Sequence, residues 1–121
     1  MNRERVEEQD AMIKRIDVMI DDHNLISFCI NLEYQDKSIQ TLSFMMDEYD
    51  PEHNRRRSAP WVGPLIRKIM EVLQVTSLKE LEGRWCRVKY TSGRVQQIGH
   101  MRHDHFVDVW NFVEQYGDRR D

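Results

Sequence analysis

The sequence lacks any apolar run close to the roughly 20 residues that a membrane-spanning helix needs. Its first ten residues carry four acidic residues and no apolar core of a secretion signal. Cysteine is scarce, and Cys29 and Cys86 lack C-x-x-C spacing, so the sequence predicts reduced thiols and no disulfide framework. We expect a cytoplasmic protein that is neither secreted nor bound to a membrane.

Motifs for catalysis are also missing. There is no glycine-rich dinucleotide motif, no P-loop and no G-x-S-x-G elbow, and Cys29 stands in an apolar stretch where a thiol is usually inert. His100, His103 and His105 do not follow a ligand spacing typical of zinc. The sequence therefore predicts no catalytic residue, no metal and no cofactor, and an enzyme acting through these histidines ranks last.

The charge balance is slightly acidic, with 18 Lys and Arg against 21 Asp and Glu. A net charge of -3 argues against binding extended nucleic acid by bulk charge, although a local basic patch can still take a small anion. The 121 residues suffice for one domain with a modest core. Apolar residues on more than one face of the last segment, including Val107 and Phe112, favour a homo-oligomer.

Alternating apolar residues dominate the first third of the chain. Residues 11–20 and 25–34 alternate with period two, turn-forming residues 21–24 separate them, and a more polar run follows at 37–45. These patterns predict a three-stranded antiparallel meander. The first ten residues hold one apolar side chain after Met1 and are expected to be a flexible or helical lead-in.

A polar segment, residues 47–60, is expected to be a loop because it has no hydrophobic periodicity. Gly63 and Pro64 then suit the start of a helix. Its apolar stripe is Leu65, Ile66, Ile69, Met70 and Leu73.

The remaining elements follow from capping and turn residues. A short turn is predicted at 78–81, and strands at 84–91 and 94–99 are joined by a Ser-Gly hairpin turn. Asp104 is expected to cap a final helix that ends at Gly117.

The predicted order is βββαββα. It gives an α+β fold, in which an antiparallel sheet, made of the meander and a C-terminal hairpin, is packed by one central and one C-terminal helix. Residues 11–117 form the single domain, and residues 118–121 form a tail.

The strongest local charge feature is Arg55, Arg56 and Arg57, just before Trp61 and the predicted helix start. Guanidinium groups and a helix N-terminus suit a phosphate, and an indole can stack on a base. The alternative is that these arginines offset the acidic residues upstream. In the binding hypothesis, further residues complete the site: His23, Arg67, His100 and Arg102.

Four stretches carry a family resemblance: IDDHN at 20–24, LEYQDKSIQTLSFMMD at 32–47, RSAPWVGPLIRKIMEVLQVTSLKELEGRWCRV at 57–88 and IGH at 98–100. They resemble small phage and prophage proteins, largely of unassigned function, with the pattern EDHG, LDYGGxxQGFGGYxLD, RxGTxxGxxFIRRILEVxGVxSWEDLKGKxIRV and IGH. The family's glycines are replaced in the second stretch, and Asn24 replaces a turn glycine. Because glycine permits close approach, these departures imply an altered binding surface there.

In size and layout the chain is also similar to the Thoeris anti-defence sponges, which bind cyclic nucleotide-like immune signals between subunits. That similarity implies a phage-encoded, non-enzymatic protein of the host cell cytoplasm that sequesters a small phosphate-bearing nucleotide. The competing hypothesis is an inhibitor that binds a host defence protein and mimics nucleic acid. Its acidic cluster is Asp47, Glu48, Asp50 and Glu52.

Overall fold

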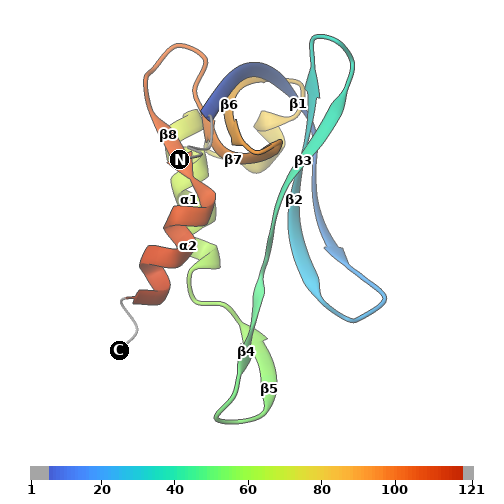
Figure 1. Ribbon diagram of the computed structural model, residues 1–121, viewed down its shortest axis with the longest axis vertical. Coiled ribbons are helices and arrows are strands. Elements are labelled where there is room, and N and C mark those ends of the chain that lie inside the picture. The colour runs from blue at the N-terminus through green and yellow to red at the C-terminus, as the bar shows by residue number, and fades with distance from the viewer. Residues whose placement is uncertain (1–5, 119–121) are drawn as a thin grey trace.

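Alternation of buried apolar and exposed polar residues builds a strongly curled antiparallel sheet, which the computed structural model describes over residues 6–118 (Figure 1). The strands before the central helix are β1 (Val6–Ile20), β2 (Ile26–Tyr34), β3 (Ile39–Met45), β4 (Asp47–Asp50) and β5 (Arg55–Ser58). The later elements are α1 (Val62–Leu73), the 3-10 helix η1 (Leu78–Leu81), β6 (Trp85–Thr91), β7 (Arg94–Gly99), β8 (Phe106–Asp108) and α2 (Val109–Asp118). The predicted α+β fold, with its meander, later hairpin and two helices, is confirmed.

The long first strand joins the two halves of the main sheet, whose order is β3-β2-β1-β6-β7-β8. The C-terminal part of β1 pairs with β2, and its N-terminal part pairs with β6. A bulge between Ile13 and Arg15 lies where the strand changes partners. Bulges of this kind bend a strand and increase its twist.

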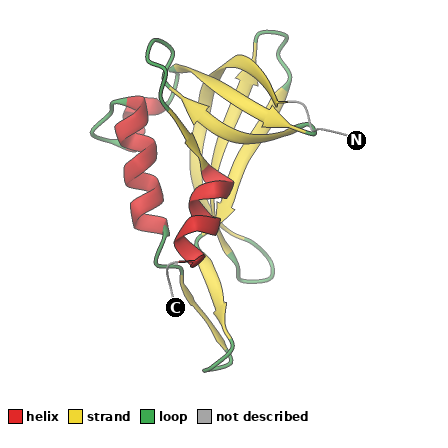
Figure 2. Ribbon diagram, turned by 60° about the vertical axis from the view of Figure 1, so that its left-hand side comes forward, coloured by secondary structure: helices red, strands yellow, loops and turns green. Residues whose placement is uncertain are grey.

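The curl brings β3 close to β7, and the Gln40 side chain donates to the Gly93 carbonyl across the opening. Five strands, β1, β2, β3, β6 and β7, thus form a partly open barrel with α1 between the third and fourth of them (Figure 2). This is the topology of an OB-fold, a five-stranded Greek-key barrel. The core fills its interior, where Ile13, Phe28 and Ile98 are fully buried.

Two expectations for the first half of the chain are wrong. Residues 6–10 do not form a lead-in, because β1 already pairs there with β6, from Val6 opposite Thr91 onward. Residues 47–58 are not a plain loop, because β4 and β5 form a hairpin that projects from the barrel (Figure 1). Residues 1–5 and 119–121 lie outside the described residues.

The start of the last helix also differs from the prediction. The segment after Asp104 first forms β8, and the Asp108 carboxylate accepts the Asn111 backbone N–H, so Asp108 caps α2. Val107 is therefore a buried strand residue, and Phe112 packs against the core. The apolar excess that suggested a partner surface is used largely within the fold.

Both helices lie on the same side of the barrel and contact β7, β8 and each other (Figure 2). α1 buries Leu65, Ile69 and Leu73 of the predicted stripe. None of the helices in residues 6–118 combines the length and apolarity required to cross a membrane.

Candidate functional site

The three consecutive arginines lie on β5, opposite the acidic strand β4. The register places Arg57 opposite Glu48 and Arg55 opposite Asp50. The Arg57 guanidinium lies 3.2 Å from a Glu48 carboxylate oxygen and 3.5 Å from an Asp50 oxygen. Arg57 thus offsets the upstream acids, whereas Arg56 donates to the Asp47 carbonyl, and Arg57 is the one arginine of the three with an ion pair among the described residues.

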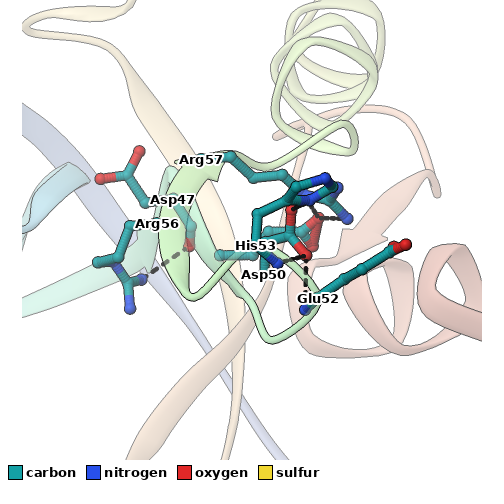
Figure 3. Close-up of polar contacts among 7 residues, drawn as sticks. Asp47, Asp50, Glu52, His53, Arg56 and Arg57 are labelled. Atoms are coloured by element: carbon teal, nitrogen blue, oxygen red, sulfur yellow. Dashed lines mark hydrogen bonds and ion pairs between the residues drawn. The ribbon is translucent and has the colours of Figure 1, made fainter.

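Asp50 is the centre of the polar contacts in this hairpin (Figure 3). It is only 3% exposed and accepts the backbone N–H groups of Glu52 and His53, while the His53 ring Nδ1 lies 2.7 Å from its other oxygen. The bond to His53 is the main reason that the pKa of Asp50 lies below its usual range. Asp50 and Glu48 of the acidic cluster are therefore partly neutralised within the hairpin, and the nucleic-acid mimic stays a prediction.

Other residues of the predicted anion site are dispersed. Trp61 is buried and packs edge-on against Phe44 with ring centroids 5.9 Å apart, so the expectation that it stacks on a base is wrong. Arg67 forms an ion pair with Glu71 on the surface of α1. His23 is exposed in the turn after β1. His100 and Arg102 lie in the loop between β7 and β8, at the end of the molecule opposite the hairpin tip (Figure 1, Figure 2).

A pocket of about 510 Å³ opens beside that loop. This volume lies within the roughly 300–1,000 Å³ typical of small-molecule sites. Its lining joins four parts of the chain: Ile13, Leu73, Gln74, Leu81, Gly83, Arg84, Trp85, His100, Met101, Arg102 and His103. The lining holds two arginines and two histidines and no carboxylate, which makes the pocket a candidate anion site.

One wall is the segment Gly83–Trp85, which main-chain bonds hold against β1. The Ile13 N–H donates to the Arg84 carbonyl and the Gly83 N–H donates to the Ile13 carbonyl, both at 2.7 Å. Gly83 turns the chain into β6 with φ of +86°, a conformation that favours glycine. Trp85 is 45% exposed, so part of its ring is available to a planar ligand.

A second wall is formed by residues 100–103 of the loop between β7 and β8. His100 Nδ1 accepts the Arg102 backbone N–H at 3.0 Å, and this contact assigns the ring proton of the neutral form to Nε2. The rings of His100 and His103 lie 4.6 Å apart. Gly99 ends β7 beneath the loop, where an added Cβ would lie 2.6 Å from the Phe106 ring, so a larger residue would displace the loop.

Positive charge collects around His100. Its pKa is lowered first by burial and then by the neighbouring charges of His103, Arg102, Arg84 and Arg87. Arg84 has only a distant acidic neighbour, Glu80 at 3.9 Å, and Arg102 has no ion-pair partner within residues 6–118. Both guanidinium groups therefore retain donors for a ligand.

The C-terminus of α1 borders the pocket, and a helix C-terminus carries a partial negative charge. Its carbonyls are partly satisfied, because the Gln74 N–H donates to Glu71 O and the Val75 N–H donates to Met70 O. The remaining repulsion between this helix end and an anionic ligand is about 0.3–1 kcal/mol at an exposed site. It is smaller than the roughly 1.5–3 kcal/mol that one hydrogen bond to a charged group contributes. The arginines therefore determine the preferred sign of a ligand.

The face of β2 and β3 is a frequent ligand surface in OB-folds. Here none of its outward residues is aromatic or positively charged: Ser27, Cys29, Asn31, Glu33, Ile39, Thr41, Ser43 and Met45. The fold does not by itself assign a function, and the chemistry of the side chains points to the pocket.

Neither thiol belongs to the pocket. Burial raises the pKa of Cys86 to about 12 and also raises the pKa of Cys29, so both stay protonated near neutral pH. Within residues 6–118, two groups of carboxylates and imidazole have ligand atoms within 4.8 Å of one another, and both lie outside the pocket. They are Asp21, Asp22 and His23, and Asp50, Glu52 and His53.

Comparisons with protein-family models, with curated proteins and with solved structures find no match to this chain.

Sequence reasoning placed His100 and Arg102 in a ligand site but omitted Arg84, Trp85 and His103 from it. The missed signal is the hairpin register, in which Arg87 pairs with Gly99 across β6 and β7. The register ends at that pair, and Arg84 and Arg102 lie in the two segments that continue beyond this end of the hairpin, where both line the pocket. The two arginines and the exposed Trp85 flank the same end of this hairpin, so the register would have indicated a shared site.

Proposed function

We propose that the protein binds a small phosphate-bearing nucleotide in the pocket beside the β7–β8 loop. One observation carries the proposal: Arg84 and Arg102 line the pocket next to the exposed ring of Trp85, with no carboxylate in the lining. Guanidinium groups bind phosphate oxygens through a fork of N–H donors, and an indole face stacks on a base.

Binding without turnover fits the lining best. It contains no Ser, Thr, Cys, Asp, Glu or Lys side chain that would serve as a nucleophile or carboxylate base. His100 already uses Nδ1 to accept a backbone N–H. These features support sequestration of the ligand, and the roles as a phage-encoded anti-defence protein and as a homo-oligomer stay predictions.

Calorimetric titration of the full chain tests the proposal. The panel contains cyclic dinucleotides, cyclic trinucleotides, isomers of cyclic ADP-ribose and linear mononucleotides, with a nucleoside and inorganic phosphate as the two partial ligands. We expect saturable binding of at least one nucleotide, and weaker binding of either part alone. Absence of binding across the whole panel would overturn the proposal.

The fate of the bound nucleotide separates sequestration from catalysis. After prolonged incubation, denaturation and mass analysis of the released ligand should recover the intact nucleotide. Recovery of a cleaved product would replace the binding function by an enzymatic one at the same pocket. Native mass spectrometry of the same sample reports the number of subunits.

A further inference from the structure

We propose that Arg87 is the positioning residue of this pocket: it holds the β7–β8 loop in the conformation that places His100, Arg102 and His103 along one wall. The inference rests on the proposed function where it concerns nucleotide binding. The effect of Arg87 on the loop conformation does not depend on that function. Arg87 is absent from the lining, so it would act through the loop and not by contact with the nucleotide.

Two hydrogen bonds connect Arg87 to the loop. Its Nε donates to the His100 carbonyl at 2.9 Å and its Nη2 donates to the His103 carbonyl at 2.8 Å. One planar guanidinium thereby fixes both ends of the segment 100–103. Arginine suits this task because its donors form a rigid fork, whereas lysine offers a single ammonium group.

Further contacts fix the arginine itself. Its guanidinium carbon lies 4.8 Å from the centre of the Phe106 ring, and its side chain is only 21% exposed. Nη1 lies 3.5 Å from a Glu8 carboxylate oxygen on β1, and Nη2 lies 3.8 Å from Asp104. The N-terminal extension of β1 thereby contributes to the loop through Glu8, which gives this segment a role in the site. A binding site is effective when its contact residues are supported in this way.

The effect on His100 is specific. Its Nδ1 accepts the Arg102 N–H only while the backbone of residues 100–102 keeps its present turn. Arg87 holds the carbonyl at the start of that turn, so loss of Arg87 should release the ring from the Nε2–H form. Long-range proton–nitrogen NMR of the histidine rings measures this directly.

The test compares Arg87→Gln with Lys89→Ala in the full chain. Lys89 is the matched control because its ammonium lies over the same Phe106 ring, 4.1 Å from its centre, and it makes no bond to a carbonyl of the loop in the described structure. In Arg87→Gln we expect a mixed His100 tautomer, amide exchange at residues 100–105 faster by tenfold or more, and nucleotide binding weaker by about tenfold or more. Lys89→Ala should leave the tautomer and the exchange rates unchanged.

Two milder variants cover the case in which Arg87→Gln does not fold. Arg87→Lys keeps the charge but loses the fork, and Glu8→Gln removes one ionic partner of the arginine. Each should accelerate exchange in the loop by a smaller factor. An unchanged His100 tautomer and unchanged loop exchange in the folded Arg87 variants would overturn the inference. If wild-type protein binds no nucleotide, the proposed function fails, while the tautomer and exchange measurements still decide the role of Arg87.

Discussion

The β4–β5 hairpin and the pocket beside the β7–β8 loop are both rich in arginine, yet their electrostatics differ. In the hairpin Arg57 meets Glu48 and Asp50 within 3.5 Å. In the pocket Arg84 has a single acidic neighbour at 3.9 Å, and the lining has no carboxylate. A run of like charges in a sequence is thus an incomplete guide to a binding site, because acidic residues on the neighbouring strand can neutralise part of it, as they do at Arg57.

The largest expected effect separates the arginines of the two regions. Replacing Arg84 and Arg102 together with glutamine should weaken nucleotide binding at least about a hundredfold, because each hydrogen bond to a charged group contributes roughly 1.5–3 kcal/mol. The matched double variant Arg55→Gln and Arg56→Gln should bind within about twofold of wild type. Calorimetry measures both, and the reverse ranking would return the ligand site to the hairpin.

The exposed aromatic residues give the next contrast. Trp85→Ala should weaken binding by roughly tenfold to a hundredfold, since stacking of one base contributes about 1–3 kcal/mol, and Trp85→Phe should recover part of this. Tyr49 on the hairpin is similarly exposed, at 52%, and Tyr49→Ala should leave the affinity unchanged. Equal losses in both variants would contradict a specific stacking role for Trp85.

Lowering the pH tests the contribution of the hairpin to stability without involving the pocket. The folded-state pKa of Asp50 lies below its ordinary value of 3.8, chiefly because of the His53 bond, so its ionised form stabilises the fold above pH 3.8. This contribution is lost as the pH falls through the lowered pKa. Asp50→Asn should therefore lower Tm at pH 7, and the difference from wild type should vanish at strongly acidic pH.

The control for Asp50 is Asp22→Asn, in the turn after β1. Asp22 is also paired with a histidine, but its side chain is 90% exposed. The Tm of Asp22→Asn should therefore match that of wild type at every pH. Circular dichroism measures the melting temperatures. Nucleotide binding should be the same in both variants, and a loss of binding in Asp50→Asn would join the two regions functionally.

The smallest expected effect is the pH dependence of binding. The pKa of His100 is lowered by burial and by nearby cations, so the ring is mostly neutral at pH 7.5. A bound anion favours the protonated ring and raises this pKa, while protonation of Nδ1 costs its bond from the Arg102 N–H, so binding should take up protons and become at most a few-fold tighter between pH 8 and pH 6. A phosphodiester ligand is used because it does not titrate in this range. His100→Gln should reduce the pH dependence of nucleotide binding, whereas His23→Gln should leave it unchanged.

Local patterns in the sequence predicted the elements whose apolar residues alternate, namely β1 to β3, α1, β6 and β7. They failed for β5, whose residues RRRS contain no apolar side chain and which is paired by its backbone with β4, with ion pairs from Arg57 to Glu48 and Asp50. They also failed for residues 6–10, because β6, which pairs with them, lies about 80 residues further along the chain. Both strands depend on tertiary partners that local periodicity does not report.

The candidate site was likewise predictable from the sequence only in part. His100 and Arg102 were recognisable as polar residues at a strand end, whereas the hairpin register is needed to bring Arg84 and Trp85 next to them. Trp61 carried the same chemical signal as Trp85. Only packing distinguishes them, because Phe44 and the core cover Trp61 and leave Trp85 exposed.

The change of partners along β1 has a consequence for folding. Only Ala11 and Met12 pair by register with both β2 and β6, and Ile13 adds its bonds to Gly83 and Arg84. The β1–β2–β3 meander is local in sequence, whereas joining it to β6 closes a long loop, a step that slows folding. Ile13 also lines the pocket, so a bound nucleotide would contact both sides of this junction. At a hundred times its Kd it would stabilise the joined state by about 2.7 kcal/mol.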